Sequence, residues 1–381
     1  MRVLVVFHYW SSPEVQYETF RRLAEHGHEV IAIHAGVYSS FSVDKPYERV
    51  TVYSLPYVDF SFKGKLTPKY PLFIGLNRLL RSLEYDVMII ASHLFLTAVQ
   101  ALRIALKMDK PTILGVHGVY AHRGPVLNSI QRIYLRTVAR WIFKKVDIIR
   151  CLTLEDAQEV MRYGAPSGKI RIIPNPINTD LFKPRIKRVE NTLIWTGRMV
   201  PEKGLRYLIE AMNILVHKYG HRDVHLLLIG AGPQQSLLFR MVKKYQLNNN
   251  VNFLGWLPRR KVAEYLSKAT LFVFPSLREG MPFSLLEALS SGLPAVGSNV
   301  PGVRSLIIHK HNGLLVPPKD PTSLARAIAY LLKHRDLRLE MSKNARKYVM
   351  ANFSYQRVLP LMEQLYTEAI ESHYGHSRRR S

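Results

Sequence analysis

The stretch REGMPFSLLEALSSGLPAVGSNVPG, residues 278–302, indicates how a large part of the chain folds. One apolar run, residues 269–276, comes just before it, and a second, residues 294–299, lies inside it. Between them, Pro282 suits the first turn of a helix, because an N–H at that position would have no partner within the helix anyway. Strand, helix and strand in this order are typical of a parallel sheet whose faces are covered by helices.

The same alternation continues through the rest of the chain in two runs. The first run starts with the apolar residues 2–7, and the second starts at residues 191–198. Residues 172–188 separate the runs with three prolines and a basic cluster, which indicates a connection between domains. We therefore predict an α/β protein with two doubly wound, Rossmann-like domains that face an interdomain cleft. The expected domains are residues 1–175 and 176–353, and a last helix at about 354–373 is expected to pack on the first domain.

The composition is that of a folded globular protein, with 47% hydrophobic and 22% charged residues. The single cysteine, Cys151, excludes a disulfide framework and a cysteine-based zinc site, and it favours a reducing compartment. No apolar run reaches the roughly 20 residues that span a bilayer, and no cleavage pattern of a signal peptide follows the first strand. We therefore expect a cytoplasmic protein, with peripheral attachment to the inner face of the membrane as an open alternative.

The net charge of +26 is the unusual property of the sequence, with 54 Lys and Arg against 28 Asp and Glu. The excess is spread over both halves of the chain. Such a charge attracts polyanions, which include nucleic acids, anionic lipid headgroups and phosphorylated substrates. The charge alone does not choose among these partners.

Glu279 lies just before the helix predicted after Pro282, and Glu287 lies within that helix. Eight residues of helix span about 12 Å, roughly the length of a sugar–diphosphate–ribose ligand. Carboxylates accept hydrogen bonds from neighbouring sugar hydroxyls, so one glutamate would hold a hexose and the other a ribose. The alternative is a surface acid and an ordinary helical glutamate with no ligand.

The segment TGRMVPEKG, residues 196–204, follows the first strand of the second run. Arg198 and Lys203 are expected at the carboxyl end of that strand, with Lys203 at the start of the next helix. Two cations beside backbone N–H groups form a receptor for a diphosphate. Taken alone, this segment is better explained as a solvated turn that carries surface charges.

Together, these segments resemble the retaining nucleotide-sugar glycosyltransferases of family four, which have the GT-B architecture. The stretches that carry the resemblance cover nearly the whole chain: AEHGHEV (24–30), IIPNPINTDLF (172–182), TGRMVPEKG (196–204), LIGAGP (228–233), VNFLGW (251–256), FPSLREGMPFSLLEALSSGLPAVGS (274–298) and HNGLLVPPKDPTSLARAI (311–328). The resemblance implies transfer of a hexose from a UDP- or GDP-sugar, with an ADP-sugar also open, to a hydroxyl acceptor.

The resemblance also implies roles for single residues. Glu279 would contact the hydroxyls of the donor sugar, Glu287 would bind the ribose, and His117 would reach the region of the anomeric carbon. Arg198 and Lys203 would hold the diphosphate and stabilise its charge as it leaves. The remaining residues implied at the donor site are Gly232, Leu257, Gly280, Met281, Pro282 and Phe283.

The chain departs from the family in its first loop. The family commonly has paired glycines there, whereas this chain has Ser11 and Ser12, followed by Pro13. These serines are expected beside the acceptor, and their conformation decides where the acceptor lies. The chain contains no Asp-x-Asp motif, so no metal ligand is assigned and no cofactor is expected. In this family the leaving phosphate is thought to take the acceptor proton, so no protein nucleophile is assigned.

Two basic segments of the first domain bear on the acceptor. Residues 60–83 contain five bases, four aromatic residues and no acid, which suits a membrane interface. Residues 128–150 carry Arg132, Arg136, Arg140 and Lys144 at helical spacing. These segments favour a lipid or a lipid-linked sugar reached at an anionic membrane, although a solvated helix face explains the second segment equally well. Soluble sugars, glycerate and sugar phosphates stay open as acceptors.

Other functions remain as alternatives. A nucleic-acid-binding protein would explain the charge but not the two glutamates, which would repel a phosphate backbone. We therefore expect no nucleic-acid partner. A GT-B protein with other chemistry, such as a nucleotide-sugar epimerase, and a catalytically silent scaffold would both keep the donor site.

Overall fold

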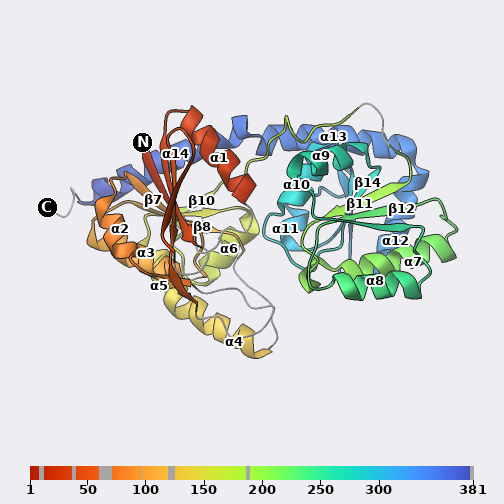
Figure 1. Cartoon of the computed structure of the whole chain (residues 1–381), viewed down its shortest axis with the longest axis horizontal. Helices are drawn as coiled ribbons and strands as arrows, with labels where there is room; N and C mark the ends of the chain where they lie inside the picture. The colour runs from red at the N-terminus through yellow and green to blue at the C-terminus, as the bar shows by residue number, and fades with distance from the viewer. Residues whose placement is uncertain are drawn as a thin grey trace. The chain divides into compact units, whose positions relative to one another are not determined.

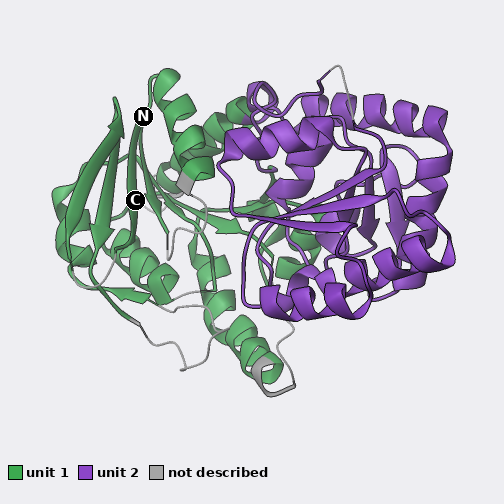
Figure 2. Cartoon of the chain, turned by 45° about the vertical axis from the view of Figure 1, so that its right-hand side comes forward, with its two compact units in different colours: residues 1–173, 359–381 green, residues 174–358 purple. Residues whose placement is uncertain are grey.

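The computed structural model describes the chain except for residues 8–12, 37–39, 60–70, 95, 119–124, 186–188 and 378–381 (Figure 1). Ser11 and Ser12, together with much of the basic segment 60–83, therefore lie outside the described residues. The chain divides into two compact units (Figure 2). Unit 1 comprises Met1–Ile173 and Leu359–Ser381, and unit 2 comprises Pro174–Val358.

Unit 1 is built on a sheet of eight described strands in the order β10-β9-β8-β7-β1-β2-β4-β3. All neighbouring strands are parallel except β3, which pairs with β4 in the antiparallel direction at one edge. The central strands β1, β7 and β8 are almost wholly buried, as the apolar runs predicted. The strands are β1 (Arg2–Val6), β2 (Glu29–Ala35), β3 (Ser42–Tyr47), β4 (Val50–Leu55), β7 (Val87–Ile90), β8 (Thr112–Val116), β9 (Ile148–Cys151) and β10 (Ile170–Ile172).

Helices cover this sheet, and a small hairpin of β5 (Tyr57–Asp59) and β6 (Pro71–Phe73) lies beside it. The buried side chains of α2, α3 and α5, such as Leu80, Leu102 and Phe143, join those of the strands in one core. The helices are α1 (Pro13–Glu25), α2 (Leu76–Ser82), α3 (Leu96–Lys107), α4 (Pro125–Tyr134), α5 (Arg140–Lys145) and α6 (Leu154–Arg162). A π-helical turn, Leu135–Ala139, joins α4 to α5.

The last helix, α14 (Tyr355–Ser377), begins among the residues of unit 2 and belongs to unit 1 from Leu359 onward. Its polar side chains hold it to unit 1 at several points. Glu363 accepts from His26 and His28 at 2.9 and 3.0 Å, and Glu368 pairs with Arg171. The helix therefore completes unit 1 although it lies at the other end of the sequence.

Unit 2 contains six described strands, all parallel, in the order β13-β12-β11-β14-β15-β16. Helices lie on both faces of this sheet, with α7 and α8 on one side and α9 and α13 on the other (Figure 1). The strands are β11 (Thr192–Thr196), β12 (His225–Ile229), β13 (Val251–Gly255), β14 (Leu271–Phe274), β15 (Ala295–Ser298) and β16 (Gly313–Val316). The helices are α7 (Leu205–Asn213), α8 (Gln235–Lys244), α9 (Arg259–Lys268), α10 (Phe283–Ser290), α11 (Pro301–Arg304), α12 (Pro321–Lys333) and α13 (Arg335–Phe353).

The strand order of unit 2 reverses between β11 and β14. Chain connections leave these two strands toward opposite sides, and ligands of open parallel sheets bind beside such a reversal, at the carboxyl ends of the strands. The structure thus confirms the predicted α/β class with two sheets, parallel except for the edge strand β3, and it directs attention to the loops that follow β11, β12 and β14.

Two local predictions are wrong by a few residues. Lys203 does not open a helix: it ends a 3₁₀ turn, Pro201–Lys203, and Gly204 with φ 65° separates that turn from α7. Pro282 does not lie in the first turn of α10 but caps it, with an extended ψ of 118°. In both cases the chain turns sharply before the helix, because the loops at this edge of the sheet pack backbone against backbone.

Candidate functional site

The loops at the carboxyl edge of the unit 2 sheet approach one another closely. A Cβ on Gly230 would lie 1.8 Å from the carbonyl oxygen of Gly197, and a Cβ on Gly204 would lie 2.1 Å from that of Pro275. Only glycine permits these approaches, and both residues also have positive φ angles, 129° and 65°, which favour glycine. Glycines therefore bring the loops that follow β11, β12 and β14 into direct backbone contact.

Two residues of the predicted donor site meet within this group of loops. Nζ of Lys203 donates to Oε1 of Glu279 at 2.6 Å, and the ammonium also lies 5.6 Å from the centre of the Phe274 ring. The side chains are 21% and 9% exposed, so the ion pair is largely shielded from water. The structure thus brings together a cation and a carboxylate that lie 76 residues apart in the sequence.

Glu287 lies in the middle of α10 and is buried. It forms an ion pair with Arg259, the first residue of α9, whose Nη2 donates to Oε1 of Glu287 at 2.7 Å. The Arg259 guanidinium lies 5.0 Å from the centre of the Phe182 ring. Arg259 could not be predicted from the sequence, because β14 lies between α9 and α10 and no regular spacing relates residues 259 and 287.

The amino end of α10 is held in place by other parts of unit 2. A Cβ on Gly302 would lie 2.0 Å from the carbonyl oxygen of Gly280, so those two backbones are in contact. The backbone N–H of Asn175 donates to the sulfur of Met281 at 3.4 Å. Pro282 and Phe283 follow as the cap and first residue of the helix. The first amides of a helix have no partner within it and carry partial positive charge, so this end favours an anion.

The remaining predicted donor residues lie at the same edge. Arg198 follows β11 and is exposed, while Met199 beside it donates its N–H to the carbonyl oxygen of Ala231 at 2.9 Å. Gly232 lies in the loop after β12, and Leu257 follows β13. Except for Glu287, in the middle of α10, the predicted donor residues of unit 2 come from loops or helix ends that follow the strands of one sheet.

His117 belongs to unit 1 and follows β8 directly. Arg150 pairs with Gly115 in the register of β8 and β9, and Nε2 of His117 lies 3.4 Å from where a Cβ on Gly115 would be. Desolvation of the ring and the positive charge of Arg150 both lower the pKa of His117, so the imidazole is neutral at pH 7 although the residue as a whole is exposed.

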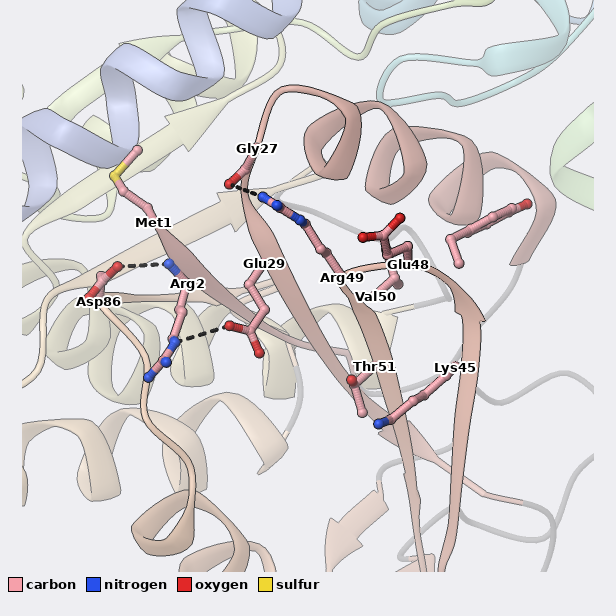
Figure 3. Close-up of a pocket in the computed structure, with 11 residues that line it drawn as sticks. Met1, Arg2, Gly27, Glu29, Lys45, Glu48, Arg49, Val50, Thr51 and Asp86 are labelled. Atoms are coloured by element: carbon pink, nitrogen blue, oxygen red, sulfur yellow. Dashed lines mark hydrogen bonds and ion pairs between the residues drawn. The ribbon is translucent and has the colours of Figure 1, made fainter.

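The described residues contain no group of three or more His, Cys, Asp or Glu side chains suited to a metal ion. A cavity of about 790 Å³ lies in unit 1, but at the opposite, amino-terminal edge of the sheet. The Arg2 guanidinium donates to Glu29, the backbone N–H of Arg2 donates to Asp86, and Arg49 donates to the carbonyl oxygen of Gly27 (Figure 3). We assign this cavity no role in the reaction.

Two family descriptions match consecutive parts of the chain. Residues 14–181 match "Glycosyltransferase Family 4", and residues 176–348 match "Glycosyl transferases group 1". The chain belongs to glycosyltransferase family 4. The family-4 chain is therefore a retaining glycosyltransferase with the GT-B fold, which transfers a sugar from a nucleotide sugar. This membership decides for the predicted enzyme and against a nucleic-acid-binding protein or an epimerase.

Individual relatives agree with this assignment. The family-4 chain is 28% identical over 316 residues to the UDP-Gal:alpha-D-GlcNAc-diphosphoundecaprenol alpha-1,3-galactosyltransferase of Escherichia coli, covering 78% of this chain and 79% of that one. A sucrose-phosphate synthase from Thermosynechococcus elongatus has a similar structure, with a TM-score of 0.80, 20% identity and coverage of 97% and 98%. Anabaena HepE, solved with UDP and glucose, gives a TM-score of 0.76, 16% identity and coverage of 96% and 100%.

Proposed function

We propose that this family-4 enzyme moves a hexose from a UDP- or GDP-sugar to a hydroxyl of a lipid-linked acceptor, with retention and without a metal ion. The observation that carries the donor part is the arrangement around the amino end of α10, where Lys203 pairs with Glu279 on one side and Glu287 lies within the helix. Two carboxylates, a cation and free helix amides together suit a diphosphate between two sugars.

Each group has a distinct task in the proposed site. Arg198, Lys203 and the first amides of α10 hold the diphosphate, Glu279 binds hydroxyls of the hexose, and Glu287 binds the ribose. The bond between the anomeric carbon and the diphosphate oxygen breaks, and a new bond to the acceptor oxygen forms on the same face of the sugar. The acceptor proton passes to the departing phosphate oxygen. The cations stabilise the negative charge that develops on the diphosphate, which is the part a metal ion plays elsewhere.

We favour uridine as the base to test first. The E. coli relative is named for a UDP-sugar, and the Anabaena structure contains UDP. In the family-4 chain the expected base-binding stretch includes Leu257 and follows Trp256, an aromatic side chain that is 70% exposed. GDP is the second nucleotide to test.

The proposed acceptor is carried at an anionic membrane surface, and exposed residues of α4 support this. Ile130 and Ile133 are 57% and 65% exposed, and Arg132 and Arg136 are exposed on the same helical segment. An exposed apolar pair flanked by cations suits the headgroup region of an anionic leaflet. The described part of the chain contains no helix that is both long and apolar enough to cross a bilayer.

A groove of about 420 Å³ between β6, α2 and α3 adds a second basic and apolar surface in unit 1. Arg81, Arg103 and Lys107 line it together with apolar side chains that include Leu72. The Arg103 guanidinium also lies 5.8 Å from the centre of the Trp141 ring, so α3 and α5 are neighbours. The E. coli relative acts, by its name, on a diphosphoundecaprenol-linked sugar, which is the class of acceptor we propose.

The donor part is tested by titrating the purified chain with UDP and GDP, with and without EDTA, by calorimetry. One nucleotide should bind, EDTA should leave its affinity unchanged, and Arg198→Ala should weaken it about tenfold, because one charge-assisted hydrogen bond is lost. Arg240→Ala removes an equally exposed cation from α8 and should have no effect. No binding of either nucleotide would refute the proposal, and so would binding that requires a divalent ion.

A further inference from the structure

Arg259, the first residue of α9, contacts both a carboxylate and an aromatic ring. Its Nη2 and Nε approach the same carboxylate oxygen, Oε1 of Glu287, at 2.7 and 3.3 Å. Its guanidinium packs on the ring of Phe182, which is fully buried. The ring therefore fixes the arginine, and the arginine fixes the carboxylate.

Burial restricts the movement of the Arg259 and Glu287 side chains. The side chains of Arg259 and Glu287 are 19% and 10% exposed, and the neighbours of Glu287 in α10, Leu286 and Ala288, are fully buried. A carboxylate in such surroundings needs a partner, since an unpaired buried charge is costly. Replacing a buried pair by apolar residues often leaves stability unchanged, however, so stability alone is weak support for an ion pair.

We infer that Arg259 is a positioning residue, which holds the Glu287 carboxylate in the orientation that receives the ribose hydroxyls of the donor nucleotide. The inference rests on the proposed function, because that proposal assigns the ribose to Glu287. Hydrogen bonds to a diol depend steeply on direction, so a carboxylate held in one rotamer binds it better than a mobile one. Arg259 thus determines how strongly the enzyme distinguishes ribose from deoxyribose.

The competing explanation is that Arg259 is a structural clip between α9 and α10. A clip would affect thermal stability but would leave the preference for ribose unchanged. The two explanations are therefore separated by a ratio of affinities measured on the same variant, in which any general loss of stability or nucleotide affinity cancels.

The experiment titrates whichever of UDP and GDP binds, together with its 2′-deoxy and 3′-deoxy forms, into four proteins. These are the wild type, Arg259→Met, Arg259→Lys and the control Arg260→Met. Arg260 is the adjacent residue on α9 and is exposed, so its replacement removes the same charge without touching Glu287. Calorimetry gives the dissociation constants, and a melting curve of each variant reports its stability.

The wild type and Arg260→Met should bind the ribonucleotide about tenfold more tightly than at least one deoxy form, as expected for the loss of a charge-assisted hydrogen bond. In Arg259→Met this ratio should fall to about two or less, mainly through weaker binding of the ribonucleotide. Arg259→Lys keeps the charge but not the planar fork, so its ratio should lie between these values.

If Arg259→Met prefers the ribonucleotide over its deoxy forms by the same ratio as the wild type, the inference is overturned and the proposed donor site stays intact. Equal binding of ribose and deoxyribose by the wild type would overturn it as well. If the wild type binds neither nucleotide, the proposed function fails first, and the inference fails with it. If Arg259→Met does not fold, Arg259→Lys decides: a ratio equal to that of Arg260→Met refutes the positioning role.

Discussion

Nζ of Lys203 lies 2.6 Å from Oε1 of Glu279, so an ion pair joins the loop after β11 to the loop after β14. The pair is mostly shielded from water. Each partner thereby holds the other at the edge of the sheet where strand order reverses, which is a general position for ligands in such folds.

Replacing either partner of this pair should separate their two roles. Lys203→Ala should weaken nucleoside diphosphate binding. Glu279→Gln should leave this binding nearly unchanged but lower kcat/KM for the sugar donor at least 100-fold, because the hexose hydroxyls lose the carboxylate that accepts their hydrogen bonds. Both effects are measured on the same preparation by calorimetry and by donor turnover. A Glu279→Gln enzyme with wild-type turnover would show that the carboxylate does not contact the sugar.

The state of His117 leads to a prediction about pH. Since desolvation and Arg150 lower its pKa, the histidine stays neutral at and somewhat below pH 6.5, the value at which an ordinary histidine is half protonated. The profile of kcat/KM against pH should therefore show no limb near 6.5. His117→Ala should lower kcat with little change in UDP affinity. A limb near 6.5 that disappears in His117→Ala would contradict this.

The exposed isoleucines of α4 give a prediction about membranes. Ile130→Glu combined with Ile133→Glu should abolish co-sedimentation with vesicles of equal parts phosphatidylcholine and phosphatidylglycerol at low salt. The wild type should sediment with these vesicles and be released at high salt, as expected for an electrostatic contribution.

A charge control separates this surface from the overall charge of the protein. One variant combines Arg132→Glu with Arg136→Glu. The control combines Lys243→Glu with Lys244→Glu, which lowers the net charge by the same amount but at exposed positions of α8. Only the variant with Arg132→Glu and Arg136→Glu, at the end of α4 and in the π-helical turn after it, should lose vesicle binding. Equal losses in both variants would mean that the net charge of +26, and not α4, causes the attraction.

Asp156 gives a prediction about stability. It is buried near the start of α6, where its N–H donates to Oγ1 of Thr153 at 3.0 Å. Burial raises the pKa of its carboxyl from 3.8 to about 6. Between these values the folded state binds the proton more tightly than the unfolded chain does. Stability is therefore lost as pH rises from about 4 to 6, and the cost above pH 6 is about 3 kcal/mol.

Asp156→Asn removes this titration. The melting temperature of the variant relative to the wild type should therefore rise by about 5 °C between pH 4 and pH 7. Asp44→Asn, at an exposed position of β3, serves as the control and should show no such rise. A difference between Asp156→Asn and the wild type that does not change with pH would mean that the carboxyl titrates alike in the folded and unfolded states.

The parallel strands could be predicted because burial on both faces makes them continuously apolar, as in residues 111–118 and 191–198. The edge strand β3 could not, since SVDKPY is exposed along most of its length and resembles a loop. The ion pair of Lys203 and Glu279 joins two motifs that were each assigned to the donor, so their meeting was expected. Arg259 was missed because its contact with Glu287 depends on how α9 and α10 pack, which no spacing in the sequence encodes.

Unit 1 is discontinuous in the sequence, because it ends at Ile173 and is completed by α14 from Leu359 onward. Recombination between family members at a single crossover between residues 171 and 368 would therefore separate Glu368 from its native partner Arg171. A chimera that exchanges unit 2, the proposed donor half, needs two junctions, one after residue 173 and one after residue 358. Unit 2 can therefore be exchanged only as an insertion between two junctions and not by end-to-end fusion.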